Sequence, residues 1–141
     1  MEKEQYLEVY RHSLAHILAK AVLELYGKET QYAIGPQIDD GFYYDFVLPE
    51  GKTIQEADFK KIEDKMREIL KRKENWTRKE VSRAEALEIF KGQHFKTELI
   101  EELPEDETIT IYYTGDDYVD LCRGPHVENS QDLLSAAFEL R

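Results

Sequence analysis

Two pairs of side chains suited to acid–base or metal chemistry stand out in the sequence. His12 and His16 are four residues apart, a spacing that places two imidazoles on one face of a helix. Cys122 and His126 have the same separation, but the Gly-Pro dipeptide at 124–125 excludes a regular helix and indicates a fixed turn. The chain has one cysteine and four histidines, so these pairs use most of its soft ligands and predict one shared polar site.

Two chemistries suit these side chains, and the residues alone leave both open. Imidazole nitrogen and thiolate sulfur are zinc ligands, so the two pairs offer a full set. Four protein ligands would close the zinc coordination shell, whereas a catalytic zinc needs one position open for water. In the second chemistry no metal takes part, and histidines orient a water molecule and transfer protons near neutral pH. Either pair alone is more often a surface or core feature, but together they favour a site.

Three segments around these residues resemble the second N-terminal domain, the editing domain, of bacterial threonyl-tRNA synthetases. The family order and separations are kept, and the likeness runs over nearly the whole chain. The sequence is more loosely similar to the editing domains of alanyl-tRNA synthetases, which share the HxxxH and CxxxH patterns. The three segments are RHSLAH (11–16), IGPQIDDGFYYDF (34–46) and YVDLCRGPH (118–126).

The resemblance implies an aminoacyl-tRNA deacylase that hydrolyses seryl-tRNA(Thr), the mischarged product of the synthetase, and releases serine. Serine lacks one methyl group of threonine, and a binding pocket gains only about 1–3 kcal/mol from such a group. A second site that excludes threonine therefore corrects the error. The implied partners are the acceptor end of tRNA(Thr) carrying serine and the remaining domains of a larger synthetase.

The resemblance also assigns roles to single residues. His12 and Lys96 are expected to position the water or the leaving ribose oxygen, and the lysine cation offsets charge on the oxyanion. His16 and Asp120 are expected to hold the substrate. Cys122 lines the pocket, since attack by water needs no protein nucleophile. The expected site comprises the catalytic residues His12, Lys96, His16, Asp120 and His126 and the substrate-binding residues Tyr43 and Cys122.

No cofactor is expected for this reaction. The alternative is zinc-dependent editing of seryl-tRNA(Ala), as in the alanyl-type relatives, with zinc held by His12, His16, Cys122 and His126. A non-catalytic module that binds tRNA or zinc is a third reading of the same residues.

Charge and composition limit the kind of protein. The formal net charge is -11, and an acidic chain repels phosphate because affinity for RNA rests on Lys and Arg. Other domains or a local basic patch should therefore hold the tRNA, which favours a domain excised from a larger synthetase. No apolar run approaches the roughly 20 residues needed to cross a bilayer. The charged N-terminus lacks the apolar core of a signal peptide, so we expect a cytoplasmic protein without a membrane partner.

The elements that must position these residues follow from periodicity and capping. A helix over 3–26 carries both His12 and His16, and a second begins at a Thr53–Glu56 capping box and runs to about Lys73. The core stripe of the first helix is Leu7, Leu14, Leu18, Ala21 and Leu25.

Shorter elements complete the predicted fold. The turn at Asp39-Asp40-Gly41 indicates a hairpin, and Ser82 with Glu85 forms a capping box. Helices and strands that do not alternate regularly favour an α+β fold, with an antiparallel sheet packed against two long helices in two layers. We expect a single domain over 1–141. The other predicted elements are strands at 31–38, 41–48, 76–81, 108–113, 118–122 and 136–140 and helices at 82–90 and 96–103.

Overall fold

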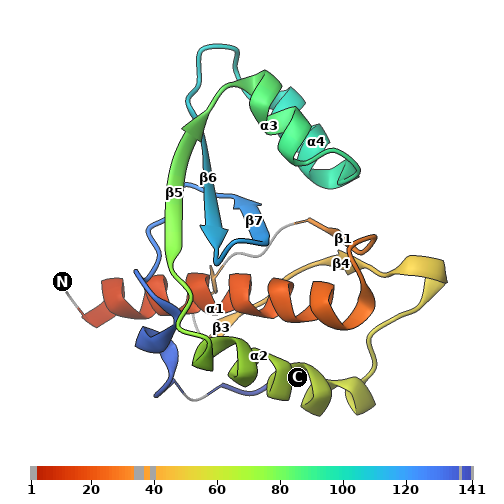
Figure 1. The fold of residues 1–141 in the computed structure, drawn as a ribbon, viewed down its shortest axis with the longest axis vertical. Helices are drawn as coiled ribbons and strands as arrows, with labels where there is room; N and C mark the ends of the chain where they lie inside the picture. The colour runs from red at the N-terminus through yellow and green to blue at the C-terminus, as the bar shows by residue number, and fades with distance from the viewer. Residues whose placement is uncertain (1–2, 34–36, 39–40, 137, 141) are drawn as a thin grey trace.

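The computed structural model describes residues 3–33, 37–38, 41–136 and 138–140 (Figure 1). The α+β class with antiparallel sheets is confirmed. The helices are α1 (Lys3–Tyr26), α2 (Phe59–Lys71), α3 (Arg83–Ile89) and α4 (His94–Glu102), with short 3-10 turns at Pro49–Gly51, Glu56–Asp58 and Ser130–Leu133. The strands are β1 (Gln31–Tyr32), β2 (Gln37–Ile38), β3 (Gly41–Phe42), β4 (Phe46–Val47), β5 (Trp76–Val81), β6 (Ile109–Thr114) and β7 (Tyr118–Leu121).

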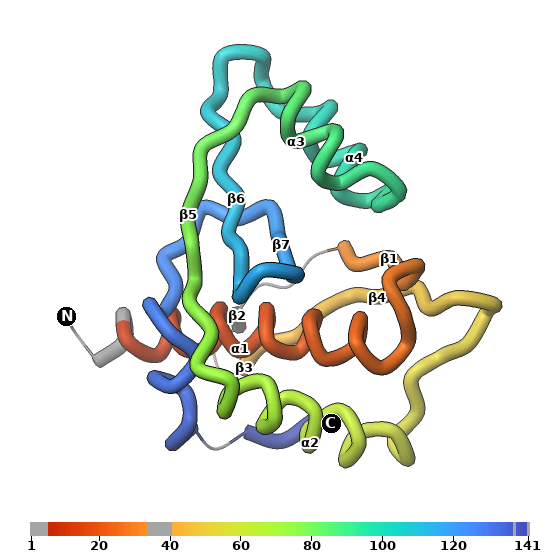
Figure 2. Tube along the Cα trace, viewed as in Figure 1, coloured from red at the N-terminus to blue at the C-terminus, as the bar shows by residue number. Residues whose placement is uncertain are grey.

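Helix α1 lies at the centre of the molecule. Helix α2 packs along one side of it, and the three-stranded antiparallel sheet β5-β6-β7 lies on another (Figures 1 and 2). All residues from 13 to 22 are therefore buried. The predicted core stripe is confirmed at Leu14, Leu18 and Ala21. Leu7 is 39% exposed, because the first turns of α1 extend past the elements that cover the rest of the helix (Figure 1).

The segment after α1 forms the predicted hairpin as two short ladders. Strand β1 pairs with β4 through Gln31 with Val47, and β2 pairs with β3 through Ile38 with Gly41. The two predicted strands at 31–38 and 41–48 are therefore interrupted between these ladders. The predicted turn residues Asp39 and Asp40 lie outside the described residues.

Two helix starts differ from their prediction. The capping box before α2 joins Gln55 and Asp58, because the Thr53 hydroxyl accepts a hydrogen bond from the Gln55 side chain at 3.3 Å instead of capping the helix. Helix α4 begins at His94, two residues before the predicted start. The His94 N–H donates to Gln31 Oε1 at 2.8 Å, and this hydrogen bond explains the earlier start. The Ser82–Glu85 capping box is confirmed.

The predicted last strand at 136–140 is wrong. The described residues of this segment have no regular secondary structure. Phe138 packs its ring under the guanidinium of Arg67 on α2, 4.4 Å from the ring centre, so this residue packs on a helix. Among the described residues, no helix is long and apolar enough to cross a membrane.

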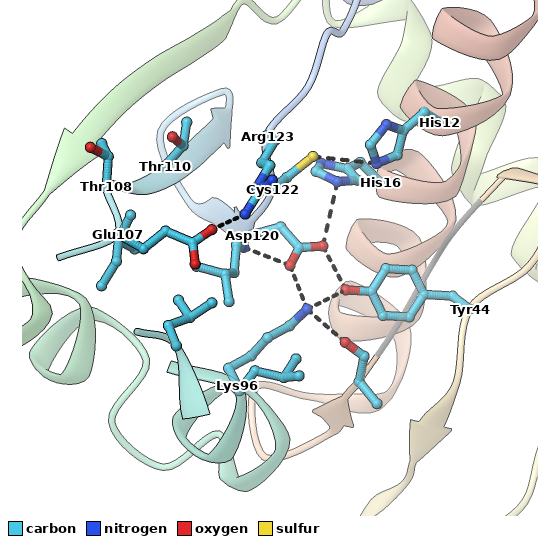
Figure 3. Close-up of a pocket in the computed structure, with 15 residues that line it drawn as sticks. His12, His16, Tyr44, Lys96, Glu107, Thr108, Thr110, Asp120, Cys122 and Arg123 are labelled. Carbon is cyan, nitrogen blue, oxygen red and sulfur yellow. Dashed lines mark hydrogen bonds and ion pairs between the residues drawn. The ribbon is translucent and has the colours of Figure 1, made fainter. Parts of the chain in front are cut away.

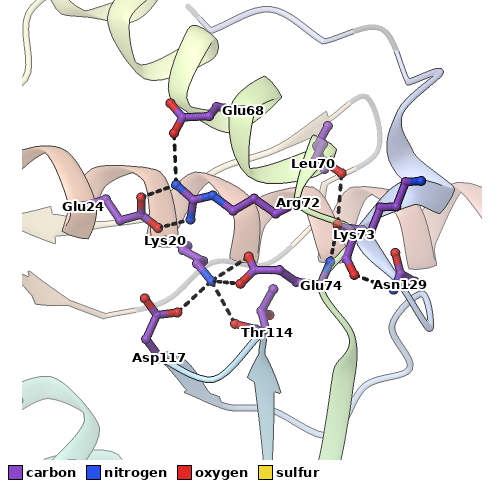
Figure 4. A network of polar contacts seen from close by, with 11 residues as sticks. Lys20, Glu24, Glu68, Leu70, Arg72, Lys73, Glu74, Thr114, Asp117 and Asn129 are labelled. Carbon is purple, nitrogen blue, oxygen red and sulfur yellow. Dashed lines mark hydrogen bonds and ion pairs between the residues drawn. The ribbon is translucent and has the colours of Figure 1, made fainter.

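A buried lysine joins α1 to the sheet (Figure 4). Lys20 is 2% exposed. Its Nζ donates to Glu74 Oε1 at 2.7 Å, to Asp117 Oδ1 at 2.8 Å and to the Thr114 carbonyl at 3.1 Å. Glu74 precedes β5, and the other two acceptors flank the turn from β6 to β7. Because Lys20 lies one helical turn after His16, this contact sets the position of α1 relative to β7.

Candidate functional site

Helix α1 and the loop after β7 bring the two predicted pairs together. Cys122 Sγ lies 3.3 Å from His12 Nε2 and 3.2 Å from His126 Nε2. The rings of His16 and His126 are 4.2 Å apart at their centres. The ligand atoms of all four side chains lie within 4.8 Å of one another. The structure therefore places His12, His16, Cys122 and His126 in one cluster.

The loop from 122 to 127 is fixed by local contacts. Gly124 has φ +75°, and a Cβ there would lie 2.3 Å from the Tyr112 hydroxyl, so only glycine fits. Its N–H donates to Cys122 Sγ at 3.2 Å. On α1, Ser13 Oγ accepts from the Val127 N–H at 3.1 Å and forms a 3.0 Å hydrogen bond with His126 Nδ1. Ser13 was not predicted as part of the site, although it lies between the two histidines of RHSLAH.

Beside this cluster, Lys96 and Asp120 form a buried ion pair. Lys96 Nζ lies 2.6 Å from Asp120 Oδ1, and the two side chains are each 3% exposed. The ammonium also donates to the Ala33 carbonyl at 2.7 Å and to the Tyr44 hydroxyl at 3.0 Å. Three acceptors match the three N–H groups of a lysine, so Lys96 is held in one place (Figure 3).

The Asp120 carboxylate collects further donors. Oδ2 accepts from the Tyr44 hydroxyl at 2.5 Å and from the Tyr118 hydroxyl at 2.9 Å. Oδ1 also accepts from the Leu121 N–H at 2.7 Å, and His16 Nε2 lies 3.5 Å from Oδ2. A strand places every second side chain on one face, so Tyr118 could have been predicted as a neighbour of Asp120, but it was not.

The structure does not bring Tyr43 to this site. Its side chain is exposed and lines a separate apolar groove along α1. Tyr44 is buried and contacts Lys96 and Asp120 instead. Successive side chains of an extended chain point to opposite sides, so a shift of one residue exchanges the tyrosine inside for the one outside.

The site opens into a pocket of about 350 Å³, within the size range of ligand pockets. His126 does not line it and lies behind Cys122. In Figure 3 the pocket runs from the histidines past Asp120 to Glu107 and Arg123. The predicted residues that line it are His12, His16, Lys96, Asp120 and Cys122, joined by Tyr44.

Comparisons with known proteins agree with the motifs. Residues 109–140, which include Asp120, Cys122 and His126, match the family model described as the threonyl and alanyl tRNA synthetase second additional domain. The chain is 50% identical over 131 residues, 92% of its length, to the threonine–tRNA ligase of Thermotoga neapolitana. It is 52% identical over 127 residues to that of Desulfatibacillum aliphaticivorans and 47% identical over 127 residues to that of Aquifex aeolicus, covering 90% and 88% of the chain.

The chain is related to the second-additional-domain region of bacterial threonyl-tRNA synthetases. The resemblance carried by the three motifs is therefore confirmed. The chain spans only a fifth of these relatives: 20%, 19% and 20% of their lengths, in the order given.

Burial sets the protonation of the clustered histidines. Desolvation lowers the pKa of His12, and desolvation with the nearby His12 and Lys96 lowers the pKa of His16 well below its usual value. Desolvation and the two other histidines also lower the pKa of His126. The three imidazoles are therefore neutral near pH 7, and each offers one nitrogen lone pair as a proton acceptor or metal ligand.

The thiol of the same cluster is a poor nucleophile. Burial raises the pKa of Cys122 to about 12, and the thiolate is the reactive form of cysteine. Burial and the neighbouring Asp120 carboxylate raise the pKa of Tyr44 well above its usual value. Tyr44 therefore stays protonated and donates to Asp120, while Cys122 stays a thiol unless a metal binds it.

The four clustered side chains fit zinc. His16 Nδ1 is buried and has no hydrogen-bond partner among the described residues. Its other nitrogen, Nε2, faces Asp120, an arrangement that orients metal-bound histidines in many sites. His126 is oriented in the same way by Ser13. His12, His16, Cys122 and His126 would hold the ion, and four protein ligands are typical of a structural zinc.

Proposed function

We propose that this domain is an editing aminoacyl-tRNA deacylase that hydrolyses seryl-tRNA(Thr) and releases serine. One observation carries the proposal. In a chain about half identical to threonine–tRNA ligases, a buried lysine and a neutral histidine face the same pocket of about 350 Å³. A proton acceptor and a cation are groups that speed the hydrolysis of an ester by water, because they take the water proton and stabilise the oxyanion. The tRNA and the remaining synthetase domains are the partners that this reaction implies.

The chemistry uses His12 and Lys96. A water oxygen attacks the seryl carbonyl carbon while a neutral His12 accepts the water proton. The carbonyl oxygen gains negative charge, which the Lys96 ammonium stabilises. The bond to the ribose oxygen then breaks, and that oxygen takes the proton from His12. Serine and the free ribose hydroxyl leave, so atoms and charge balance without a cofactor.

Asp120 acts on Lys96 and not directly on the substrate. An ionised carboxylate has about four acceptor positions, and Lys96, Leu121, Tyr44 and Tyr118 donate to the Asp120 oxygens. No acceptor position of the Asp120 carboxylate is then left for the ammonium group of the substrate. Lys96 instead can exchange its longest contact, the 3.0 Å bond to the Tyr44 hydroxyl, for the substrate oxygen. His16 is then the residue left to hold the seryl group from this side.

Cys122 and His126 have supporting roles in this mechanism. Cys122 lines the pocket as a neutral thiol and stays close to the seryl group. His126 packs behind it, between Ser13 and the thiol, and acts by holding the loop against α1. Threonine is excluded by contact of its extra methyl group with the pocket wall.

The second candidate function is zinc-dependent editing of seryl-tRNA(Ala). The unpartnered His16 Nδ1 favours it, because a buried nitrogen without a partner is costly and a metal would satisfy it. Bound zinc would supply a Lewis acid or, with all four ligands in place, a structural link between α1 and the loop after β7. The first proposal keeps hydrolysis metal-free, because a closed shell of four protein ligands leaves no position for water.

A deacylation assay distinguishes these functions. The domain is incubated with seryl-tRNA(Thr), seryl-tRNA(Ala) and threonyl-tRNA(Thr), and zinc content is measured before and after chelation. We expect turnover of seryl-tRNA(Thr) that persists after chelation, and spared threonyl-tRNA(Thr). Lys96→Met should abolish it, whereas Lys91→Met, at an exposed site in the loop before α4, should not. Preference for seryl-tRNA(Ala) with loss on chelation would support the second candidate. No turnover by a folded domain would indicate a binding module.

A further inference from the structure

One strong cation of the pocket has no role in the proposed mechanism. Among the described residues that line the pocket, the Lys and Arg side chains are Lys96 and Arg123. Lys96 is buried and spends its donors on Asp120, Ala33 and Tyr44. Arg123 follows Cys122 directly, and its side chain is 80% exposed. Its guanidinium therefore offers positive charge at the mouth of the pocket, not at its floor.

A carboxylate from a distant segment holds this guanidinium. Arg123 Nη2 forms an ion pair and hydrogen bond with Glu107 Oε1, from the loop before β6. In the view of Figure 3, this pair lies on the side of Asp120 away from Tyr44. An exposed ion pair contributes little to stability, so the bond is readily exchanged. A guanidinium has five N–H donors in a planar fork, and a fork of this kind fits the oxygens of a phosphate.

The chemistry of the substrate puts a phosphate near this position. In aminoacyl-tRNA the ester joins the seryl carbonyl to the ribose of the terminal adenosine, and the phosphate of that nucleotide lies across the same ribose. If the ester carbonyl meets Lys96 and His12 inside the pocket, the phosphate stays at the mouth. The chain has a net charge of -11, so it repels phosphate unless a local cation binds it.

We propose that Arg123 binds the 5′-phosphate of the terminal adenosine, releasing Glu107 when the substrate enters. This inference rests on the proposed deacylase function and adds a phosphate subsite to it. Glu107 holds the arginine side chain over the pocket mouth in the free domain. It also competes with the phosphate, so the same carboxylate positions Arg123 and discriminates against weakly anionic ligands.

The test compares two stable analogues that differ only in the phosphate. Both carry serine as an amide on 3′-amino-3′-deoxyadenosine, with a 5′-phosphate or with a free 5′-hydroxyl, and Kd is measured by calorimetry. We expect wild type to bind the phosphorylated analogue about tenfold more tightly, as for a charge-assisted hydrogen bond. Arg123→Gln should lose that preference and keep its affinity for the 5′-hydroxyl analogue. Glu107→Gln should increase the preference, because the competing carboxylate is gone.

Arg78→Gln is the matched control. Arg78 is also exposed and paired with a carboxylate, that of Glu80, but it does not line the pocket. It should leave both affinities unchanged. A uniform loss of affinity in Arg123→Gln, or an unchanged preference for phosphate, would overturn the phosphate subsite. If wild type binds neither analogue, the proposed function itself fails, so the two failures are distinguishable.

Discussion

Removing the Tyr44 hydroxyl tests which of the two adjacent tyrosines in the FYYD segment belongs to the site. Tyr44→Phe deletes an oxygen that donates to Asp120 Oδ2 at 2.5 Å and accepts from Lys96 Nζ at 3.0 Å. A hydrogen bond to a charged group contributes about 1.5–3 kcal/mol. Asp120 keeps its bonds from Tyr118 and Leu121, so neither charge is left without a partner. We therefore expect the variant to fold with a free energy of unfolding lower by about 2 kcal/mol.

The same substitution should slow hydrolysis. In the proposed mechanism Lys96 exchanges its Tyr44 contact for the substrate, but the Tyr44 hydroxyl also donates to Asp120 Oδ2 at 2.5 Å, and Asp120 holds Lys96 in place. Without this donor, the Asp120 carboxylate and the Lys96 ammonium paired with it can shift. A displacement of the ammonium weakens its contact with the oxyanion, and we expect kcat to fall about tenfold or more. The Tyr44 hydroxyl contacts Lys96 and Asp120 and has no contact with the substrate in the proposed mechanism. KM should therefore change less than kcat.

Tyr43→Phe is the internal control for this prediction. The Tyr43 side chain is 44% exposed, so its hydroxyl should contribute less than about 0.5 kcal/mol to stability. Urea unfolding and seryl-tRNA(Thr) deacylation are measured for both variants. Equal losses in the two variants, or a loss of activity confined to Tyr43→Phe, would contradict the placement of Tyr44 at the site.

Three further substitutions test the scaffold and the roles assigned above. Lys20→Met should lower the free energy of unfolding by about 1–3 kcal/mol, since it leaves the half-buried Glu74 carboxylate without its lysine partner, and adding Glu74→Gln should restore part of this loss in urea titrations. Gly124→Ala should destabilise the domain by at least about 1–3 kcal/mol, because alanine is strained at φ +75° and its methyl group would collide with Tyr112. A variant as stable as wild type would refute this close approach. Cys122→Ala should retain hydrolysis, and its abolition in the alanine variant with retention in Cys122→Ser would show that the residue is required as a nucleophile or donor.

The elements that carry the site followed from local patterns. The helix over 3–26, the Ser82–Glu85 capping box and the strands β6 and β7 follow from patterns of neighbouring residues, and the structure confirms these elements, although β6 is buried along nearly its whole length and not on alternate residues. The stop of α1 at Gly27, which has φ +102°, is of the same kind. These features depend on periodicity and turn chemistry, which a single sequence displays directly.

The misplaced features depend on contacts between distant segments. The choice between Tyr43 and Tyr44 depends on which side of the hairpin faces Lys96, and the sequence of the hairpin carries apolar groups on both sides. The start of α4 depends on the Gln31 side chain, far away in the sequence. The residues around Lys20 in the sequence did not predict its burial, because its partners Glu74, between α2 and β5, and Thr114, at the end of β6, are distant in the sequence. Pairing of this kind becomes visible only once the chain is folded.

The placement of charge bears on how an acidic chain could carry out the proposed reaction on a nucleic acid. Lys60 and Lys65 on α2 pair with Asp64 and Glu68, and Arg72, directly after the helix, pairs with Glu24, so these three cations are neutralised within the chain. In the pocket, Lys96 and Arg123 are also paired, with Asp120 and Glu107, but both line the cavity that the proposed substrate enters. Positive charge is thus held where an ester and one phosphate would lie, which suits recognition of a single terminal nucleotide. The body of a tRNA needs many phosphate contacts, and we expect those from synthetase segments other than the described residues. Binding of the seryl-adenosine analogues should therefore depend far less on salt than binding of whole tRNA by a full-length relative.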